Sequence, residues 1–315
     1  MESTRFSRFI KRQSTNLVVY LILVLMIVLT GLLSDVFFSS RNVTNLLRQV
    51  APLGFVSIGQ TLAILAGGID LSVGSVVSMV SCLMSGIING QTQLVLPIVA
   101  LVIALSLLVG LINGLIISKT GVSPLIATLG MMSIVQGATL LYTKVPLGAV
   151  PESFSFLAWG SFGFIPAPIV LLAVVCVVYT VILQRSVFGR YIYATGGNET
   201  VAHLSGIKTT RIKMAVYMMC SLGAALTGIF LVSRMGMGDP LIGERYMLDS
   251  IVPVLIGGTR LTGGKGGIIG TIAGVFIFTV LGNALNLLNV STYWQWIVEG
   301  LVVIVSVAFT FGQKS

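Results

Sequence analysis

The stretch AGGIDLSVGS, residues 66–75, sets an acidic side chain, Asp70, between a glycine pair and two serines. Continuous apolar runs flank it on both sides, over residues 50–66 and 72–88. In a water-soluble protein this stretch would be an ordinary polar loop. Between two runs that cross a lipid bilayer it lies at or near membrane depth, where a charged side chain is costly and needs a structural or functional reason.

The composition indicates that these runs do lie in a membrane. Apolar residues make up 56% of the 315 residues and charged residues only 9%, and the mean hydropathy is +1.04. A soluble domain carries about 25% charged residues. The sequence therefore predicts an integral membrane protein, with residues 1–315 forming one transmembrane domain. Cys82, Cys176 and Cys220 stand singly in apolar runs, as buried small hydrophobic residues do.

The fold class follows from the length and continuity of the apolar runs. A membrane-spanning helix needs about 20 apolar residues, and runs without alternation favour helices over barrel strands. We predict an all-α polytopic membrane protein with about ten spans: 17–33, 50–66, 72–88, 95–117, 124–142, 166–184, 213–233, 249–258, 267–288 and 294–311. The run 249–258 is short and ends in glycines, so eight spans with this segment re-entrant is the alternative.

The distribution of Lys and Arg predicts how the chain is oriented. Ten spans that start inside place 13 of the 18 Lys and Arg residues on the cytoplasmic side. Residues 1–16 are then a basic cytoplasmic N-terminus, 143–165 a periplasmic loop that lies on the membrane surface, and 185–212 a cytoplasmic loop. Both termini are cytoplasmic. The same bias accounts for the net charge of +9, so no nucleic-acid partner is expected.

The cytoplasmic loop contains a short predicted helix, within GGNETVAHLSGI. Asn198 can cap it, Glu199 occupies the first turn where the helix dipole favours an anion, and Gly206 ends it. Ala202 falls on the same face as Glu199 and Gly206. Such a small-residue face suits docking into a groove of another protein, and a plain surface helix that joins two spans is the alternative.

These residues carry a resemblance to a known family. The spacing of Glu199, Ala202 and Gly206 resembles the coupling motif of bacterial ABC importer permeases. The string FGRYIYATGGNETVAHLSGIKTTRIK, residues 188–213, resembles the inner loop of the ribose/galactose-type sugar permeases. GGIDLSVGS, TLGMMSIVQG (128–137) and LIGGTRLTGGKGGIIGT (255–271) are similar to further blocks of that family, in the same order.

The resemblance implies a permease subunit and a set of partners. It implies a second permease copy or a close homologue, a cytoplasmic ABC ATPase that binds ATP and Mg, a periplasmic sugar-binding protein, and a place in the lipid of a bacterial inner membrane. Glu199, Ala202 and Gly206 would couple ATP hydrolysis to transport. Glu299 and Arg260 depart from the family pattern, which favours a basic and a small polar residue at these places.

No ATP site is expected in this chain. The nearest candidate, TRLTGGKGG, has Thr259 where a phosphate-binding loop requires its first glycine, and Gly266 where it requires Ser or Thr. The sequence thus predicts a transporter subunit without a cofactor or metal of its own, and not an enzyme.

A weak internal repeat points to the substrate path. LAGGIDLSVGSVV (65–77) aligns with LIGGTRLTGGKGG (255–267), which sets Asp70 opposite Arg260. Paired glycine-rich helix breaks in two halves of a transporter are typical of the substrate pathway. The candidate residues of the path or of the breaks are Gly67, Gly68, Asp70, Ser72, Gly257, Gly258, Arg260, Asn113 and Asn283.

Several roles remain open for the polar residues of this set. Asp70 could pair with Arg260 or cap the broken helix, gate the path, or contact the sugar. Amides such as Asn113 and Asn283 could bind sugar hydroxyls or join neighbouring helices. Glu299 lies beside Tyr293, Trp294 and Trp296, which could be no more than an interfacial aromatic belt.

The predicted function is a permease subunit that forms the path for a monosaccharide, a pentose or a hexose, driven by ATP hydrolysis in a partner. A permease for branched amino acids or a furanosyl signal molecule is an alternative. A self-sufficient secondary transporter is another, although ion coupling usually needs more intramembrane acids than Asp70 and Glu299.

Overall fold

The computed structural model describes residues 2–312, and the side chains of residues 17–302 and 304. Its long helices are α1 (Glu2–Leu33), α2 (Ser40–Leu65), α3 (Val73–Ile88), α4 (Val95–Thr120), α5 (Pro124–Tyr142), α7 (Ala167–Arg185), α10 (Thr209–Met235), α13 (Ile268–Leu287) and α14 (Thr292–Gly312). Shorter helices join them: η1 (Thr92–Leu94), η2 (Glu152–Ser155), α6 (Phe156–Trp159), α8 (Val187–Gly197), α9 (Glu199–Leu204), α11 (Glu244–Asp249) and α12 (Val252–Ile256). Two-residue strands, β1 (Ser161–Phe162) and β2 (Ile165–Pro166), form a small antiparallel hairpin.

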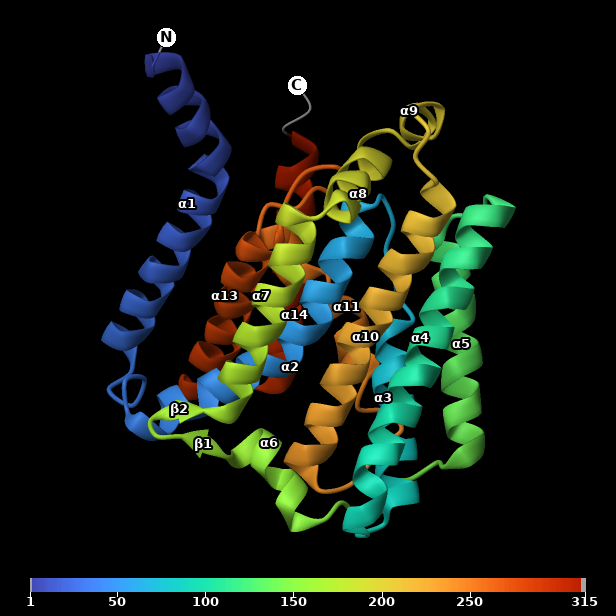
Figure 1. Ribbon diagram of the computed structural model, residues 1–315. Helices are drawn as coiled ribbons and strands as arrows, with labels where there is room; N and C mark the ends of the chain where they lie inside the picture. Colours follow the sequence, from blue (N-terminus) through green and yellow to red (C-terminus); the bar gives the residue numbers. More distant parts are fainter. Residues whose placement is uncertain (1, 313–315) are drawn as a thin grey trace.

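The long helices lie side by side in one bundle (Figure 1). Helix α10 is central, because it packs against α2, α3 and α4. Helices α8 and α9, the N-terminal end of α1 and the C-terminal end of α14 lie at the upper end of Figure 1. Helix α6 and the hairpin lie at the lower end. We call these the α9 end and the hairpin end.

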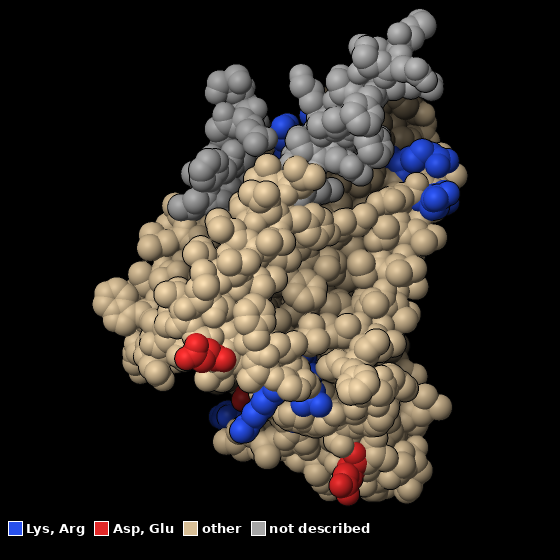
Figure 2. Space-filling model, turned by 90° about the vertical axis from the view of Figure 1, so that its left-hand side faces the viewer, with Lys and Arg blue, Asp and Glu red and all other residues tan. Residues whose placement is uncertain are grey.

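The helices confirm an all-α polytopic membrane protein. Among the described residues, five helices are long and apolar enough to cross a bilayer, and 17–33 and 73–88 are shorter apolar helical segments. Figure 2 shows one face of the bundle, where Lys, Arg, Asp and Glu gather toward the two ends and leave an uncharged surface between them. Exposed leucine and valine side chains such as Leu21, Leu25 and Val28 suit contact with lipid.

The predicted run 249–258 is not one continuous helix. Helix α11 ends at Asp249, and α12 begins at Val252 with Pro253 in its first turn. A proline ring clashes with the carbonyl four residues earlier, which here belongs to Asp249, and proline has no N–H to donate. Pro253 therefore ends one helix and starts the next.

The loop 143–165 is ordered against the hairpin end of the bundle. The Arg48 guanidinium lies 5.1 Å from the centre of the Trp159 ring, and Arg48 Nη2 donates to Trp159 O at 2.8 Å. Trp159 Nε1 donates to Arg234 O at 3.1 Å. These contacts join α6 to the ends of α2 and α10.

Candidate functional site

The first helix break begins where α2 ends. Ala66 is the C-cap, Gly67 takes a positive φ of 85°, and the N–H of Gly68 donates back to Ala63 O at 2.9 Å. A left-handed residue directly after the cap is a common way to end a helix, and glycine adopts it without steric cost. The chain is then free to turn before α3 starts at Val73.

Asp70 is fully buried within this break. Its Oδ1 accepts hydrogen bonds from the N–H of Ser72, at 2.9 Å, and from the Ser72 hydroxyl. Asn113 of α4 donates from Nδ2 to Ser72 Oγ at 2.9 Å and lies 3.5 Å from Asp70 Oδ1. The structure thus brings together three of the predicted residues, Asp70, Ser72 and Asn113, at the start of α3.

Sequence reasoning missed a fourth member of this cluster, Gln60 of α2. With its amide turned so that both bonds form, Gln60 donates to Asp70 O and accepts from Asp70 N, each at 3.2 Å. The signal was present, because Gln60 is the one amide in the apolar run 50–66. Its side chain supplies the backbone of Asp70 with partners that no helix or strand provides.

Asp70 and Arg260 do not form the ion pair that the repeat suggested. The ion pairs within the described part of the chain are Lys213–Glu199 and Arg245–Asp249, and Asp70 Oδ2 is buried without a hydrogen-bond partner. Of the roles left open for Asp70, its contacts therefore favour capping of the broken helix.

Backbone geometry explains why the pairing fails. The second break repeats the first, since Gly258 takes a φ of 82° and the N–H of Thr259 donates to Val254 O at 3.1 Å. Gly258 therefore corresponds to Gly67, whereas the sequence alignment sets Gly257 opposite Gly67. In this register Arg260 lies opposite Ile69 and not opposite Asp70.

The second break is also longer than the first. It runs over 257–267 and contains a turn in which the N–H of Arg260 donates to Lys265 O and that of Gly263 donates to Arg260 O, both at 2.9 Å. Gly257 lies so close to the backbone of Gly270 in α13 that a Cβ there would overlap it. The position therefore requires glycine.

The two breaks and the end of α8 meet through their backbones. The N–H of Gly264 donates to Leu65 O at 3.0 Å. A Cβ on Gly196 would overlap Leu65 O and lie 2.9 Å from Gly264 N, and a Cβ on Gly263 would lie 2.7 Å from Gly196 O and 2.9 Å from Gly67 N. We call this contact of Leu65–Gly67, Gly196–Gly197 and Gly263–Gly264 the glycine junction.

Helix α9 follows the glycine junction directly. Asn198 Oδ1 accepts from Val201 N at 3.0 Å, and Gly206 takes a φ of 85°, so the predicted cap and stop are both confirmed. Lys213 Nζ of α10 lies 2.6 Å from Glu199 Oε2. Helix α9 is thereby tied to α8 through the chain and to α10 through a charge pair.

Ala202 does not share an exposed docking face with Glu199. It is buried, whereas Val201 and Leu204 are exposed apolar side chains on the same six-residue helix. Sequence reasoning missed these two because it selected small residues at helical spacing. Their exposure at the tip of the α9 end makes them candidates for contact with a protein partner.

Asn283 lies apart from the breaks. Its amide exchanges hydrogen bonds with the amide of Asn42, at 2.9 and 3.1 Å, and so joins α13 to the first turn of α2. The first turn of α2 is at the hairpin end (Figure 1), far from Asp70. These contacts favour packing over a place beside the breaks.

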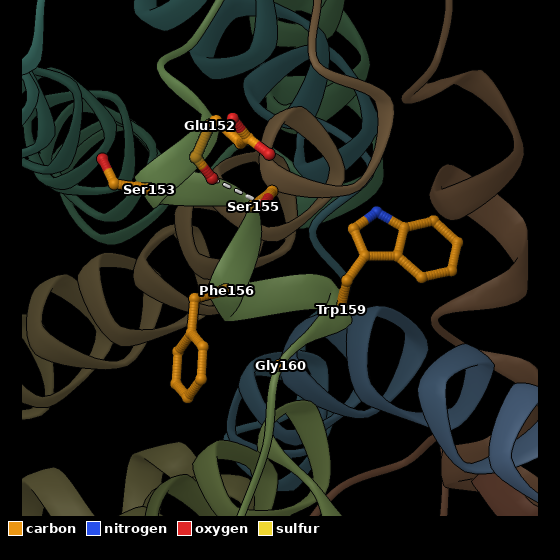
Figure 3. Close-up of a pocket in the computed structure, with 6 residues that line it drawn as sticks. All are labelled: Glu152, Ser153, Ser155, Phe156, Trp159 and Gly160. Carbon is orange, nitrogen blue, oxygen red and sulfur yellow. Dashed lines mark hydrogen bonds between the residues drawn. The ribbon is translucent and has the colours of Figure 1, made fainter.

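The hairpin end carries a shallow open hollow of about 490 Å³, lined by Glu152, Ser153, Ser155, Phe156, Trp159 and Gly160. Figure 3 shows Phe156 and Trp159 on opposite sides of α6, and the Ser155 hydroxyl donating to Glu152 O at 2.6 Å. In the described part of the chain no group of three or more His, Cys, Asp or Glu could hold a metal ion.

Comparison with known proteins assigns this architecture to a family. A model of the family "branched-chain amino acid transport system / permease component" matches residues 42–307. The chain belongs to this family. It is 44% identical to the ribose import permease protein of Bacillus subtilis over 91% of this chain and 90% of that one, so the breaks, α8 and α9 all fall within a matched permease.

Further relatives are also transport permeases. The ribose import permease protein of Escherichia coli K12 is 38% identical over 90% of each chain. The L-arabinose transport system permease protein of the same strain is 36% identical over 85% of this chain and 82% of that one. No solved structure matches the chain.

Proposed function

We propose that this chain is the membrane-spanning subunit of a bacterial ABC importer for a monosaccharide of the pentose type. The observation that carries the proposal is its identity of 36–44% to ribose and arabinose permeases over most of each chain. The glycine junction supports it, because it joins the end of α8, which leads directly into the exposed helix α9, to both helix breaks.

In this proposal, a second permease copy completes the path and a cytoplasmic ABC ATPase binds ATP and Mg at the α9 end. Exposed Val201 and Leu204 contact a groove of the ATPase. The movement of the ATPase reaches the bundle by two routes. The Glu199–Lys213 pair transmits it to α10, and the glycine junction transmits it to the breaks. Shifting the breaks changes access to the path from either side of the membrane.

The hairpin end faces the periplasm in this arrangement, and a sugar-binding protein delivers its cargo there. The N-terminal end of α1, the C-terminal end of α14 and helix α9 lie at the other end, which is then cytoplasmic (Figure 1). The positive-inside pattern of the sequence supports this orientation. The hollow beside α6 lies on the side from which the binding protein approaches.

Branched-chain amino acids are the second candidate cargo, because the description of the matching family names them. A reconstituted complex separates the two candidates. The permease is purified with its ATPase and binding protein, placed in liposomes loaded with ATP, and supplied with labelled ribose, arabinose or leucine.

We expect ATP-dependent uptake of a pentose and none of leucine. A Leu204→Glu variant should lose uptake by at least about tenfold, because a carboxylate replaces an apolar side chain in the contact with the ATPase. Leu25→Glu is not a suitable control, since it would place a charge in lipid. Leu204→Met keeps an apolar side chain of similar volume at the same position and should leave uptake close to that of the wild-type complex. Leucine uptake, or pentose uptake without the ATPase, would overturn the proposal.

A further inference from the structure

Charged side chains of α11 and α14 lie near each other, beside the contact of α12 with α14. Arg245 Nε lies 3.3 Å from Asp249 Oδ2 within α11. Glu299 of α14 is close enough for the charges of both residues to act on its carboxylate. Helix α12, which follows α11 after two residues, packs against α14. Three charges from two elements therefore share one region, and none of them belongs to the helix breaks.

This region lies below the membrane surface. Helix α14 begins at Thr292 with an aromatic cluster, Tyr293, Trp294 and Trp296, which is typical of the bilayer interface. Glu299 comes seven residues after Thr292, which at 1.5 Å per residue is about 10 Å along the helix. Apolar residues follow it over 301–305 and, after Ser306, over 307–309. Charged side chains at such depth face a water-filled cavity or protein, because facing lipid is costly.

Two of the three charged side chains are not fully buried within the chain, whereas that of Asp249 is only 16% exposed. The Arg245 side chain is 66% exposed, and Glu299 is half-buried. A charge that is open on the bundle surface at this depth needs water or polar groups in front of it. A water-filled translocation path beside α11 and α14 provides both.

The chemistry of the neighbouring residues fits a neutral sugar. Trp296 lies three residues before Glu299, so the two share a face of α14, and 63% of Trp296 is exposed. Carboxylates accept hydrogen bonds from sugar hydroxyls, a guanidinium donates to them, and an indole ring offers a flat surface to the apolar face of a sugar ring. One positive and two negative charges do not suit an anionic cargo.

We propose that Arg245, Asp249, Trp296 and Glu299 form a sugar-contacting site in the outer part of the translocation path. The proposal rests on the proposed function, since it requires that the chain conducts a sugar. It assigns Trp296 a role that differs from that of an interfacial anchor. Trp294 is the matched comparison, because it is 62% exposed and two positions away, on another side of α14.

The first experiment tests whether Glu299 meets water. Glu299→Cys and Leu301→Cys are exposed, in intact spheroplasts, to a charged thiol reagent that does not cross membranes. We expect Glu299→Cys to react and Leu301→Cys, on the opposite side of α14, to remain unlabelled. The native Cys82 and Cys220 are buried, and the unmodified protein supplies the background. Equal labelling of the two variants, or none of Glu299→Cys, would overturn the site.

The second experiment tests for contact with sugar. The site predicts that Trp296→Ala and Glu299→Gln raise the KM for pentose uptake by about tenfold, as expected when a ligand loses a hydrogen bond to a charged group or a ring contact. Trp294→Ala should leave KM unchanged. If both tryptophan variants change the KM equally, the two tryptophans belong to an interfacial belt and the proposal is wrong. A wild-type complex that imports no sugar would instead contradict the proposed function, whatever the labelling shows.

Discussion

At the scale of single residues, the contacts of Asp70 indicate its role. Its Oδ1 holds the N–H and the hydroxyl of Ser72 at the start of α3. Asp70→Ala removes that acceptor and leaves buried donors unpaired, at a cost of about 1–3 kcal/mol for each. Asp70→Asn keeps an Oδ1 in place. We therefore expect Asp70→Ala to lower the unfolding temperature of the purified protein more than Asp70→Asn does.

Arg260 provides the contrast for that measurement. Since Arg260 makes no ion pair with Asp70 in the described structure, Arg260→Ala should lower the unfolding temperature less than Asp70→Ala. The double change Asp70→Arg with Arg260→Asp should transport no better than either single change. Recovery of transport in the double variant would restore the pairing hypothesis and contradict the register derived from the helix caps.

The sequence predicted that Asp70 needs a structural reason, but not which residues supply it. A buried charge between apolar runs is visible in the order of residues alone. Its partners Gln60 and Asn113 come from α2 and α4, and their contact depends on how those helices pack. Sequence similarity aligned the two breaks to within one residue, whereas the side-chain pairing depends on the exact residue at which each helix ends.

At the scale of elements, the glycine junction offers a matched pair of variants. A Cβ on Gly196 would overlap the backbone oxygen of Leu65, while a Cβ on Gly197 would have no atom within 4 Å. Both residues belong to α8, so replacing glycine by alanine favours the helical conformation of α8 by about 1 kcal/mol at either position. Only Gly196→Ala should separate α8 from the breaks.

We expect Gly196→Ala to reduce the sugar imported for each ATP hydrolysed, because movement at α9 no longer reaches the breaks through close backbone contact. Gly197→Ala should keep the ratio of the wild-type complex. The measurement is uptake and ATP hydrolysis in the same proteoliposomes, with the amount of assembled complex as the control. The same ratio for both variants would show that coupling runs instead through the Glu199–Lys213 pair.

The boundaries of the elements show what local sequence can and cannot predict. Helix α5 has the predicted bounds, 124–142, since Pro124 starts it and its apolar run is uninterrupted. The end of α11 at Asp249 and the start of α12 at Val252 depend on Pro253, a local signal that apolar run length does not register. The close approach of Gly196 to Leu65 has no such signal, because it joins residues 131 positions apart and is created by the packing of α8 onto the breaks.

At the scale of the whole molecule, the two ends of the bundle differ in what they present to solvent. The α9 end carries exposed Val201, and the hairpin end carries Phe164, which is fully exposed in the turn between β1 and β2. If the membrane crosses the uncharged middle of the bundle (Figure 2), these residues lie on opposite sides of it. In the proposed orientation the α9 end, where Lys and Arg are in excess, faces the cytoplasm.

This orientation predicts opposite labelling of two cysteine variants by a thiol reagent that does not cross membranes. In intact spheroplasts Phe164→Cys should react and Val201→Cys should not, because only the hairpin end faces outward. In inside-out vesicles the result should reverse. Detergent should make both sites reactive, which shows that neither cysteine is hidden by the protein. Labelling of Val201→Cys in intact spheroplasts would show that the protein has the opposite orientation in the membrane. Helix α9 would then lie outside and could not receive the movement of a cytoplasmic ATPase.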